Sequence, residues 1–288
     1  MASFSTADHL ADALRAYSQP NDERLGEIVR SAVTHLYAFV EEVGLTRDEW
    51  FRGIEFLTAV GQMCDERRQE FILLSDTLGI SMLVDAINHR MPSGATESTV
   101  LGPFYRAGAP DIEMGGTIAQ TDDGDPAYVS GRVTSASGKP IAGALLDIWQ
   151  TAPNGLYETQ DEHQPDYNLR GQLRTDKDGR YAFRTVIPVS YPVPTDGPVG
   201  RMLNAMGRHP MRPAHIHFVI TAPGYERLAT HLFAEGDTYL DSDAVFGVKN
   251  SLVVKFEENG SAEMARKLGF EKAPFHTTHY DFGLKPSA

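Results

Sequence analysis

The sequence has almost no cysteine and no long apolar run. Cys64 is the only cysteine among 288 residues, which excludes an internal disulfide, a cysteine-based zinc site and an iron–sulfur cluster. No stretch approaches the roughly 20 apolar residues that a membrane-spanning helix needs. Asp8, Asp12 and Arg15 interrupt the first 19 residues, so this stretch lacks the apolar core of a signal peptide. We therefore expect a soluble, cytoplasmic protein in a reducing compartment.

Positive charge is also scarce. The chain has 26 Lys and Arg against 39 Asp and Glu, a net charge of −13 with neutral histidines. Nucleic-acid binding depends on clustered basic residues that release counterions, so we expect no nucleic-acid partner. A composition of 41% hydrophobic and 23% charged residues excludes disordered, collagen-like and coiled-coil classes. The sequence also lacks a Gly-x-Gly-x-x-Gly motif, a P-loop and βαβ alternation, so a nucleotide-binding α/β fold has no support.

The first third of the chain has helical periodicity. Its clearest stripe follows the i, i+3, i+4, i+7 rule and consists of Leu25, Ile28, Val29, Ala32, Val33, Leu36 and Val40. Thr46 followed by Glu49 is typical of a capping box at the start of the next helix. Further helices are expected at 71–78 and 80–87. We interpret residues 1–95 as a helical N-terminal domain.

The rest of the chain has short alternating runs separated by turn residues, after a segment rich in proline, glycine and serine. The predicted strands are 128–134, 144–150, 169–175, 180–187, 214–221, 228–233 and 251–257. Short strands with this punctuation favour an all-β sandwich or barrel. The sequence therefore predicts an α+β protein whose residues 96–288 form a β-sandwich catalytic domain.

One predicted strand contains His215 and His217. Residues two apart in a strand share a face, so both imidazoles are expected on one side, with Ile216 and Phe218 on the other. This geometry suits two ligands to one metal ion, although a His-x-His tripeptide also occurs as ordinary core or rim histidines.

The remaining ligands distinguish the candidate metals. A ferrous site needs a carboxylate near the histidines, but Thr221 and Ala222 occupy the expected positions. A zinc enzyme could use a distant carboxylate from the polar cluster Asp161, Glu162, His163 and Asp166. The simpler interpretation of that cluster is a solvated acidic loop.

Two tyrosines lie in loops beside predicted strands, where functional residues are common. Tyr157 follows a turn after the second predicted strand, and Tyr191 lies in a proline-rich segment not expected to form a regular ladder. Each could be a packing residue. A phenol whose pKa is about 10 binds a metal as phenolate only when a strongly Lewis-acidic cation displaces its proton. Ferric iron does this, whereas zinc and magnesium rarely do.

Together these segments resemble the intradiol ring-cleavage dioxygenases over most of the chain. The resemblance rests on residues 155–157 (Gly-Leu-Tyr), 188–194 and 212–218 (Arg-Pro-Ala-His-Ile-His-Phe), which have the family's order and approximate spacing. Residues 99–105 and 243–247 look most like the branch of the family that cleaves hydroxyquinol, 1,2,4-trihydroxybenzene.

The resemblance implies a metal site and catalytic roles. Tyr157, Tyr191, His215 and His217 would bind one non-haem Fe(III) per chain. Arg212 would face the substrate ring and stabilise developing negative charge. Tyr191, displaced by the substrate, would act as a general base.

It also implies a substrate pocket. The positions that would line it are Leu73, Asp76, Val100, Leu101, Gly102, Phe104, Val193, Pro194 and Val245. Leu73 and Asp76 are three residues apart and share a helix face, which lets the helical domain reach the substrate. At His231 the chain departs from catechol-cleaving relatives, which have a glutamine there, so the role of this residue is open.

The implied activity is cleavage of hydroxyquinol by O₂ between its adjacent hydroxyl carbons, giving maleylacetate. A homodimer through the helical region, with phospholipid between the helices, is also implied. Three alternatives remain at this point: a catechol or chlorocatechol dioxygenase, a zinc or ferrous enzyme that uses the two histidines with a carboxylate, and a non-catalytic β-sandwich binding module.

Overall fold

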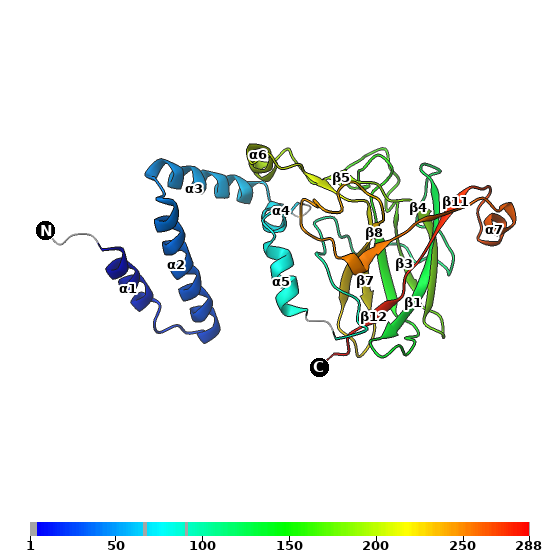
Figure 1. Cartoon of the computed structure of the whole chain (residues 1–288), viewed down its shortest axis with the longest axis horizontal. Helices are drawn as coiled ribbons and strands as arrows, with labels where there is room; N and C mark the ends of the chain where they lie inside the picture. The colour runs from blue at the N-terminus through cyan, green and yellow to red at the C-terminus, as the bar shows by residue number, and fades with distance from the viewer. Residues whose placement is uncertain (1–4, 66–67, 90–91, 288) are drawn as a thin grey trace. The chain divides into compact units, whose positions relative to one another are not determined.

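The computed structural model describes residues 5–65, 68–89 and 92–287 (Figure 1), and the chain divides into two compact units. The units are Met1–Ala59 and Val60–Ala288. Within the described ranges, no helix is both long enough and apolar enough to cross a membrane.

The N-terminal unit is built from helices that local interactions begin and end. They are α1 (Thr6–Ala16), α2 (Glu23–Val43) and α3 (Arg47–Gln62), the last of which runs across the boundary between units. Asp22 caps α2 by accepting the Leu25 N–H at 2.9 Å. The capping box is confirmed, because the Glu49 carboxylate accepts the Thr46 N–H at 2.9 Å while Thr46 Oγ1 accepts the Glu49 N–H at 3.3 Å.

Apolar side chains of this unit lie on its surface. Among its described residues only Gly26 is buried. The exposed large apolar residues are Tyr17, Leu25, Ile28, Leu36, Phe39, Val40, Val43, Trp50, Phe51, Ile54 and Leu57. The predicted helical stripe therefore exists, but this unit does not bury it.

The second unit begins with α4 (Glu70–Thr77) and α5 (Ile80–Asn88), which confirm the two helices expected there. Strands follow from Pro126 onward. The compact units divide between Ala59 and Val60, within the helical region, so the predicted domain boundary at 95/96 stays a prediction.

Two five-stranded sheets lie in the second unit within the described residues (Figure 1). One sheet has the order β10 (Glu257–Asn259), β11 (Phe275–His279), β1 (Pro126–Ser135) and β12 (Phe282–Leu284), with β4 (Arg180–Val186) paired to β1. The other has the order β3 (Arg170–Arg174), β2 (Leu145–Trp149), β7 (His215–Thr221), β8 (Leu228–Ala234) and β9 (Val253–Val254).

The core lies between these sheets. Val129 of β1 and Phe183 of β4 pack in the same buried cluster as Ile216, Phe218 and Ile220 of β7. Each sheet thus turns one apolar face inward, as in a sandwich. The predicted α+β architecture, helices followed by a β-sandwich, is confirmed.

Some segments differ from the predictions. Instead of one strand at 251–257, the chain forms the 3₁₀ turn η1 (Asn250–Leu252), then β9, then β10. The reason is that β9 pairs with β8 while β10 pairs with β11, so this segment passes from one sheet to the other.

The proline-rich segment also differs, because it forms a short ladder. The two-residue strand β5 (Tyr191–Pro192) pairs antiparallel with β6 (Met211–Arg212). The strands β11 and β12 and the helices α6 (Pro198–Ala205) and α7 (Ala262–Lys267) were not predicted.

Candidate metal centre

Strand β7 carries the His-x-His pair, as predicted. Ile216 and Phe218 enter the core between the sheets, so His215 and His217 lie on the opposite face of the strand. Both imidazoles are buried. The alternation of the strand thus separates the packing residues from the polar site.

Two other elements bring the tyrosines to this face. Tyr157 follows the turn after β2, where Gly155 has a positive φ of 79°. In the β5–β6 ladder Tyr191 lies directly opposite Arg212. Arg212 in turn precedes His215 by three residues. Both tyrosines are buried.

The four side chains converge on one point. The Tyr157 hydroxyl lies 3.0 Å from His217 Nε2 and 3.1 Å from the Tyr191 hydroxyl. The Tyr191 hydroxyl lies 3.5 Å from His215 Nε2, and the two Nε2 atoms are 3.1 Å apart. The structure therefore brings together all four residues that the resemblance named as ligands.

The histidines are suited to metal binding. His215 Nδ1 lies 2.6 Å from the carbonyl oxygen of Pro213 and donates to it, which leaves the lone pair on Nε2. Burial and the nearby Arg212 charge lower the pKa of His215 well below its usual value. Burial, followed by the neighbouring His231 and His215, lowers the pKa of His217 in the same direction. Both rings are therefore neutral and able to act as ligands.

Tyr157 sets a stricter condition. Burial, followed by the charge and hydrogen bond of Tyr191, raises the pKa of Tyr157 well above its usual value. In the protein alone this phenol keeps its proton, so only a strongly Lewis-acidic cation would make it a phenolate ligand. Two neutral imidazoles and two phenols fit such a cation.

A buried cation of the protein itself lies beside the cluster. Arg212 pairs with Asp243, with Nε and Oδ1 3.2 Å apart, and both side chains are almost fully buried. Burial opposes the charge on Arg212, but Asp243 and the two tyrosines outweigh it and raise its pKa above the usual value. Arg212 Nη1 is 3.2 Å from His215 Nε2, so the guanidinium contributes a fixed positive charge at the site.

Aromatic rings and one glycine enclose the cluster. Trp149 stacks on His217 with ring centroids 4.6 Å apart, and Phe104 stacks on Tyr157 at 4.5 Å. Gly102 has a φ of +78°, and a Cβ there would lie 3.2 Å from His217 Cε1. Glycine at this position lets the backbone approach the imidazole closely.

The predicted pocket residues are mostly buried, and some contact the cluster. Leu101 and Phe104 pack against the aromatic group formed by Trp149, Tyr157 and Tyr191. The buried aliphatic members are Leu73, Val100, Val193 and Val245, and Pro194 is partly buried. Their roles toward a substrate stay predictions.

Asp76 is the charged member of that set. Its side chain is only 2% exposed. Burial raises its pKa, while a hydrogen bond from Ser81 and the charge of Arg212 act in the opposite direction. The carboxyl group is thus within electrostatic reach of Arg212.

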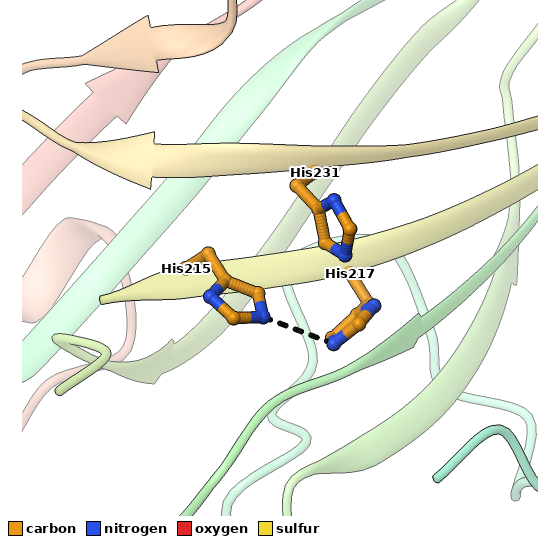
Figure 2. A group of neighbouring side chains, drawn as sticks. All are labelled: His215, His217 and His231. Carbon is orange, nitrogen blue, oxygen red and sulfur yellow. Dashed lines mark hydrogen bonds between the residues drawn. The ribbon is translucent and has the colours of Figure 1, made fainter. Parts of the chain in front are cut away.

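His231, whose role the sequence analysis left open, also lies at the site. His231 on β8 lies directly opposite His217 on β7, and Figure 2 shows its ring facing the other two imidazoles. Nitrogen atoms of His215, His217 and His231 all lie within 4.8 Å of one another. In the described residues no other group of His, Cys, Asp and Glu has this geometry, and no carboxylate belongs to it.

The acidic cluster considered for a zinc site makes other contacts. Asp161 accepts from the Asn154 side chain at 2.8 Å, and Asp166 pairs with Arg106 on the exposed surface. The sequence did not predict that Asp243 pairs with Arg212. The only signal for Asp243 was that it lies in residues 243–247, a segment that resembles the family.

Two family profiles match the chain. Residues 22–96 match the family described as "Catechol dioxygenase N terminus" and residues 100–286 match the family described as "Dioxygenase". The chain belongs to the intradiol ring-cleavage dioxygenase family.

Individual relatives agree with this assignment. The chain is 51% identical over 265 residues to hydroxyquinol 1,2-dioxygenase of Rhizobium sp. (strain MTP-10005), covering 92% of this chain and 90% of the relative. It resembles the crystal structure of hydroxyquinol 1,2-dioxygenase from Pseudomonas putida DLL-E4 with a TM-score of 0.90 and 53% identity, covering 98% and 99% of the two chains. Catechol 1,2-dioxygenase from Acinetobacter radioresistens has a TM-score of 0.88 and 30% identity, covering 100% and 95%.

Proposed function

We propose that this protein is a hydroxyquinol 1,2-dioxygenase. The observation that carries the proposal is the convergence of two phenol oxygens and two imidazole nitrogens within 3.0–3.5 Å of their neighbours. Relatives named for hydroxyquinol, at 51% and 53% identity, support this substrate more than a catechol relative at 30% identity does.

Tyr157, Tyr191, His215 and His217 would hold one non-haem Fe(III) per chain. The support is chemical, since the buried phenol of Tyr157, whose pKa is raised, needs a strongly Lewis-acidic ion to become a ligand. When bound there, Fe(III) would supply the Lewis-acid and redox chemistry that makes an aromatic diol reactive toward O₂. The reaction joins both atoms of O₂ to hydroxyquinol, opens the bond between the two hydroxyl carbons and gives maleylacetate.

The chain's own residues bind the substrate and move its protons. As a phenolate, the Tyr191 oxygen would receive a proton from a diol hydroxyl and so act as general base. Arg212, held in place by Asp243, stabilises negative charge that develops on the ring. Phe104 and Leu101 hold the ring by apolar contact and exclude water.

Asp76 supplies the specificity. Its buried carboxyl group can accept a hydrogen bond from the third ring hydroxyl, which catechol lacks. The rest of the substrate pocket consists of Leu73, Val100, Gly102, Val193, Pro194 and Val245.

The proposal extends to assembly. The exposed apolar residues of the N-terminal unit support a homodimer through the helices, with phospholipid between them as the family resemblance implies. We place the enzyme in the cytoplasm, a location that its single, unpaired cysteine supports. The domain boundary at 95/96 belongs to the same proposal.

Oxygen uptake by iron-loaded protein tests this function. The expected result is rapid uptake with hydroxyquinol, with kcat/KM about ten- to a hundredfold lower for catechol because the Asp76 carboxyl group then lacks its partner. A wild-type preference for catechol would reject the substrate assignment. Phenolate bound to Fe(III) absorbs visible light by charge transfer to the metal, so a colourless, active protein containing zinc would reject the ferric site.

A further inference from the structure

His231 is a buried side chain at the metal centre that the proposed mechanism does not use. It is 0% exposed. Its ring centroid lies 4.2 Å from that of His217 and 4.7 Å from that of His215. Because β8 pairs with β7 and His231 is opposite His217, the three rings occupy one face of the sheet (Figure 2).

The hydrogen bonds of His231 are unequal. Nδ1 makes a hydrogen bond with Thr99 Oγ1. Nε2 is buried and has no hydrogen-bond partner among the described residues. A neutral imidazole ring carries a single N–H, on one nitrogen or the other.

The Thr99 contact decides which nitrogen carries that proton. If Nδ1 donated to Thr99, the buried Thr99 hydroxyl would have no acceptor within the described structure, and Nε2 would be left with an unused lone pair. If the Thr99 hydroxyl donates to Nδ1, only Nε2–H lacks a partner. Buried polar groups are rarely left unpaired, so the second arrangement is preferred.

We propose that the Nε2–H of His231 donates a hydrogen bond to an oxygen atom of the bound diol, and that His231 is not a metal ligand. A protonated Nε2 has no lone pair for a metal ion. A diol oxygen bound at the centre of the cluster is an acceptor near His215 and His217, whose ring nitrogens are within 4.8 Å of those of His231. This inference rests on the proposed function.

The test measures iron content and diol binding separately from turnover. Wild type, His231→Leu and His231→Gln are loaded with iron, and hydroxyquinol is titrated under argon while the visible phenolate-to-iron band is followed. All three should hold about one iron per chain. His231→Leu should weaken diol binding about ten- to a hundredfold, the effect of losing a hydrogen bond to a charged group. His231→Gln keeps an N–H donor and should lie closer to wild type.

Thr99→Val tests the assignment of the proton. Without the Thr99 hydroxyl the ring can place its proton on Nδ1, so diol binding should weaken while iron is retained. The double variant Thr99→Val/His231→Leu removes both polar groups and controls for folding. Its metal-free form should unfold no earlier than that of His231→Leu, which leaves the Thr99 hydroxyl unpaired.

The outcomes separate this inference from the proposed function. Loss of iron in both His231 variants would make His231 a ligand and overturn the inference. Unchanged diol affinity in His231→Leu, or in Thr99→Val, would also overturn it while leaving the proposed function in place. Failure of the wild type to bind iron or to respond to hydroxyquinol would instead contradict the proposed function.

Discussion

The helical unit and the metal centre place their side chains in opposite ways. Described residues 5–59 expose apolar side chains such as Leu36 and Phe51 and bury only Gly26. At the metal centre, polar and charged groups such as His217 and Arg212 are almost fully buried. Each arrangement is unfavourable for an isolated chain in water. The first arrangement supports the proposed helical interface, and the second supports the proposed ferric site.

The two regions also differ in how they are held together. Capping contacts in the helical unit join residues three apart, as between Thr46 and Glu49. At the metal centre, hydrogen-bonding distances join Tyr157 to His217 and Thr99 to His231, which are 60 and 132 residues apart. Changes in the helical unit should thus act locally or on assembly, whereas changes at the centre should abolish the chemistry.

The largest effect is expected at the proposed ligands. His217→Ala should remove the bound iron together with the visible band. Since a catalytic metal supplies several kcal/mol of transition-state stabilisation, kcat should fall about a thousandfold or more. Metal analysis and oxygen uptake measure the two effects.

His163→Ala is the matched control, because His163 lies in the exposed acidic loop that an alternative zinc site would use. It should leave iron content and rate unchanged. Loss of metal in His163→Ala but not in His217→Ala would contradict the site described.

The next largest effect is expected on assembly. Leu36 is 61% exposed on α2, and Leu36→Asp would place a charge at the proposed helical interface. Burying a leucine is worth about 1.5–3 kcal/mol. With two copies in a symmetric dimer, the dissociation constant should rise about a hundredfold or more. Sedimentation at micromolar protein should therefore show monomers.

Thr34→Asp provides the control for added charge. Thr34 is an exposed residue two positions away on the same helix, and so on a different face. The Thr34→Asp variant should remain dimeric. A wild-type monomer with full activity would refute the dimer.

A smaller effect, on specificity alone, is expected at Asp76. Asp76→Ala removes the proposed acceptor for the third hydroxyl, so kcat/KM for hydroxyquinol should fall about ten- to a hundredfold while that for catechol changes little. Asp85→Asn is the control, because Asp85 is a buried aspartate of α5 that pairs with Lys249. An unchanged ratio of the two substrates in Asp76→Ala would reject the role of Asp76.

The helices, most strands and the shared face of His215 and His217 could be predicted from the sequence, because local periodicity indicates which face of an element is apolar. The alternation around His215 and His217 correctly predicted that both imidazoles lie on the face opposite Ile216 and Phe218. The same periodicity in α2 showed a stripe but not what covers it, since an internal core and an interface between chains need the same pattern.

Long-range pairing set the limit of prediction. Tyr191 reaches the site through a ladder of two residues per strand, too short to give an alternation signal. His231 lies opposite His217 only because of the register between β7 and β8. A register cannot be predicted from the sequence of either strand alone. Strands β11 and β12 were missed for a similar reason, because each is short and pairs with the distant β1.

The smallest effect is expected at the capping box of α3, a local contact of the helical unit that has no counterpart at the metal centre. Hydrogen bonds from the Thr46 backbone N–H and then from its hydroxyl lower the pKa of Glu49 below its usual value. A lowered folded-state pKa stabilises the fold above the unfolded value and loses that contribution as pH falls through the folded value. Thr46→Ala should therefore lower the unfolding midpoint at neutral pH by about 2–4 °C, with a smaller difference near pH 3, and leave kcat unchanged. Circular dichroism at both pH values measures this, and an equal loss at the two would show that the Glu49 carboxylate has no part in the cap.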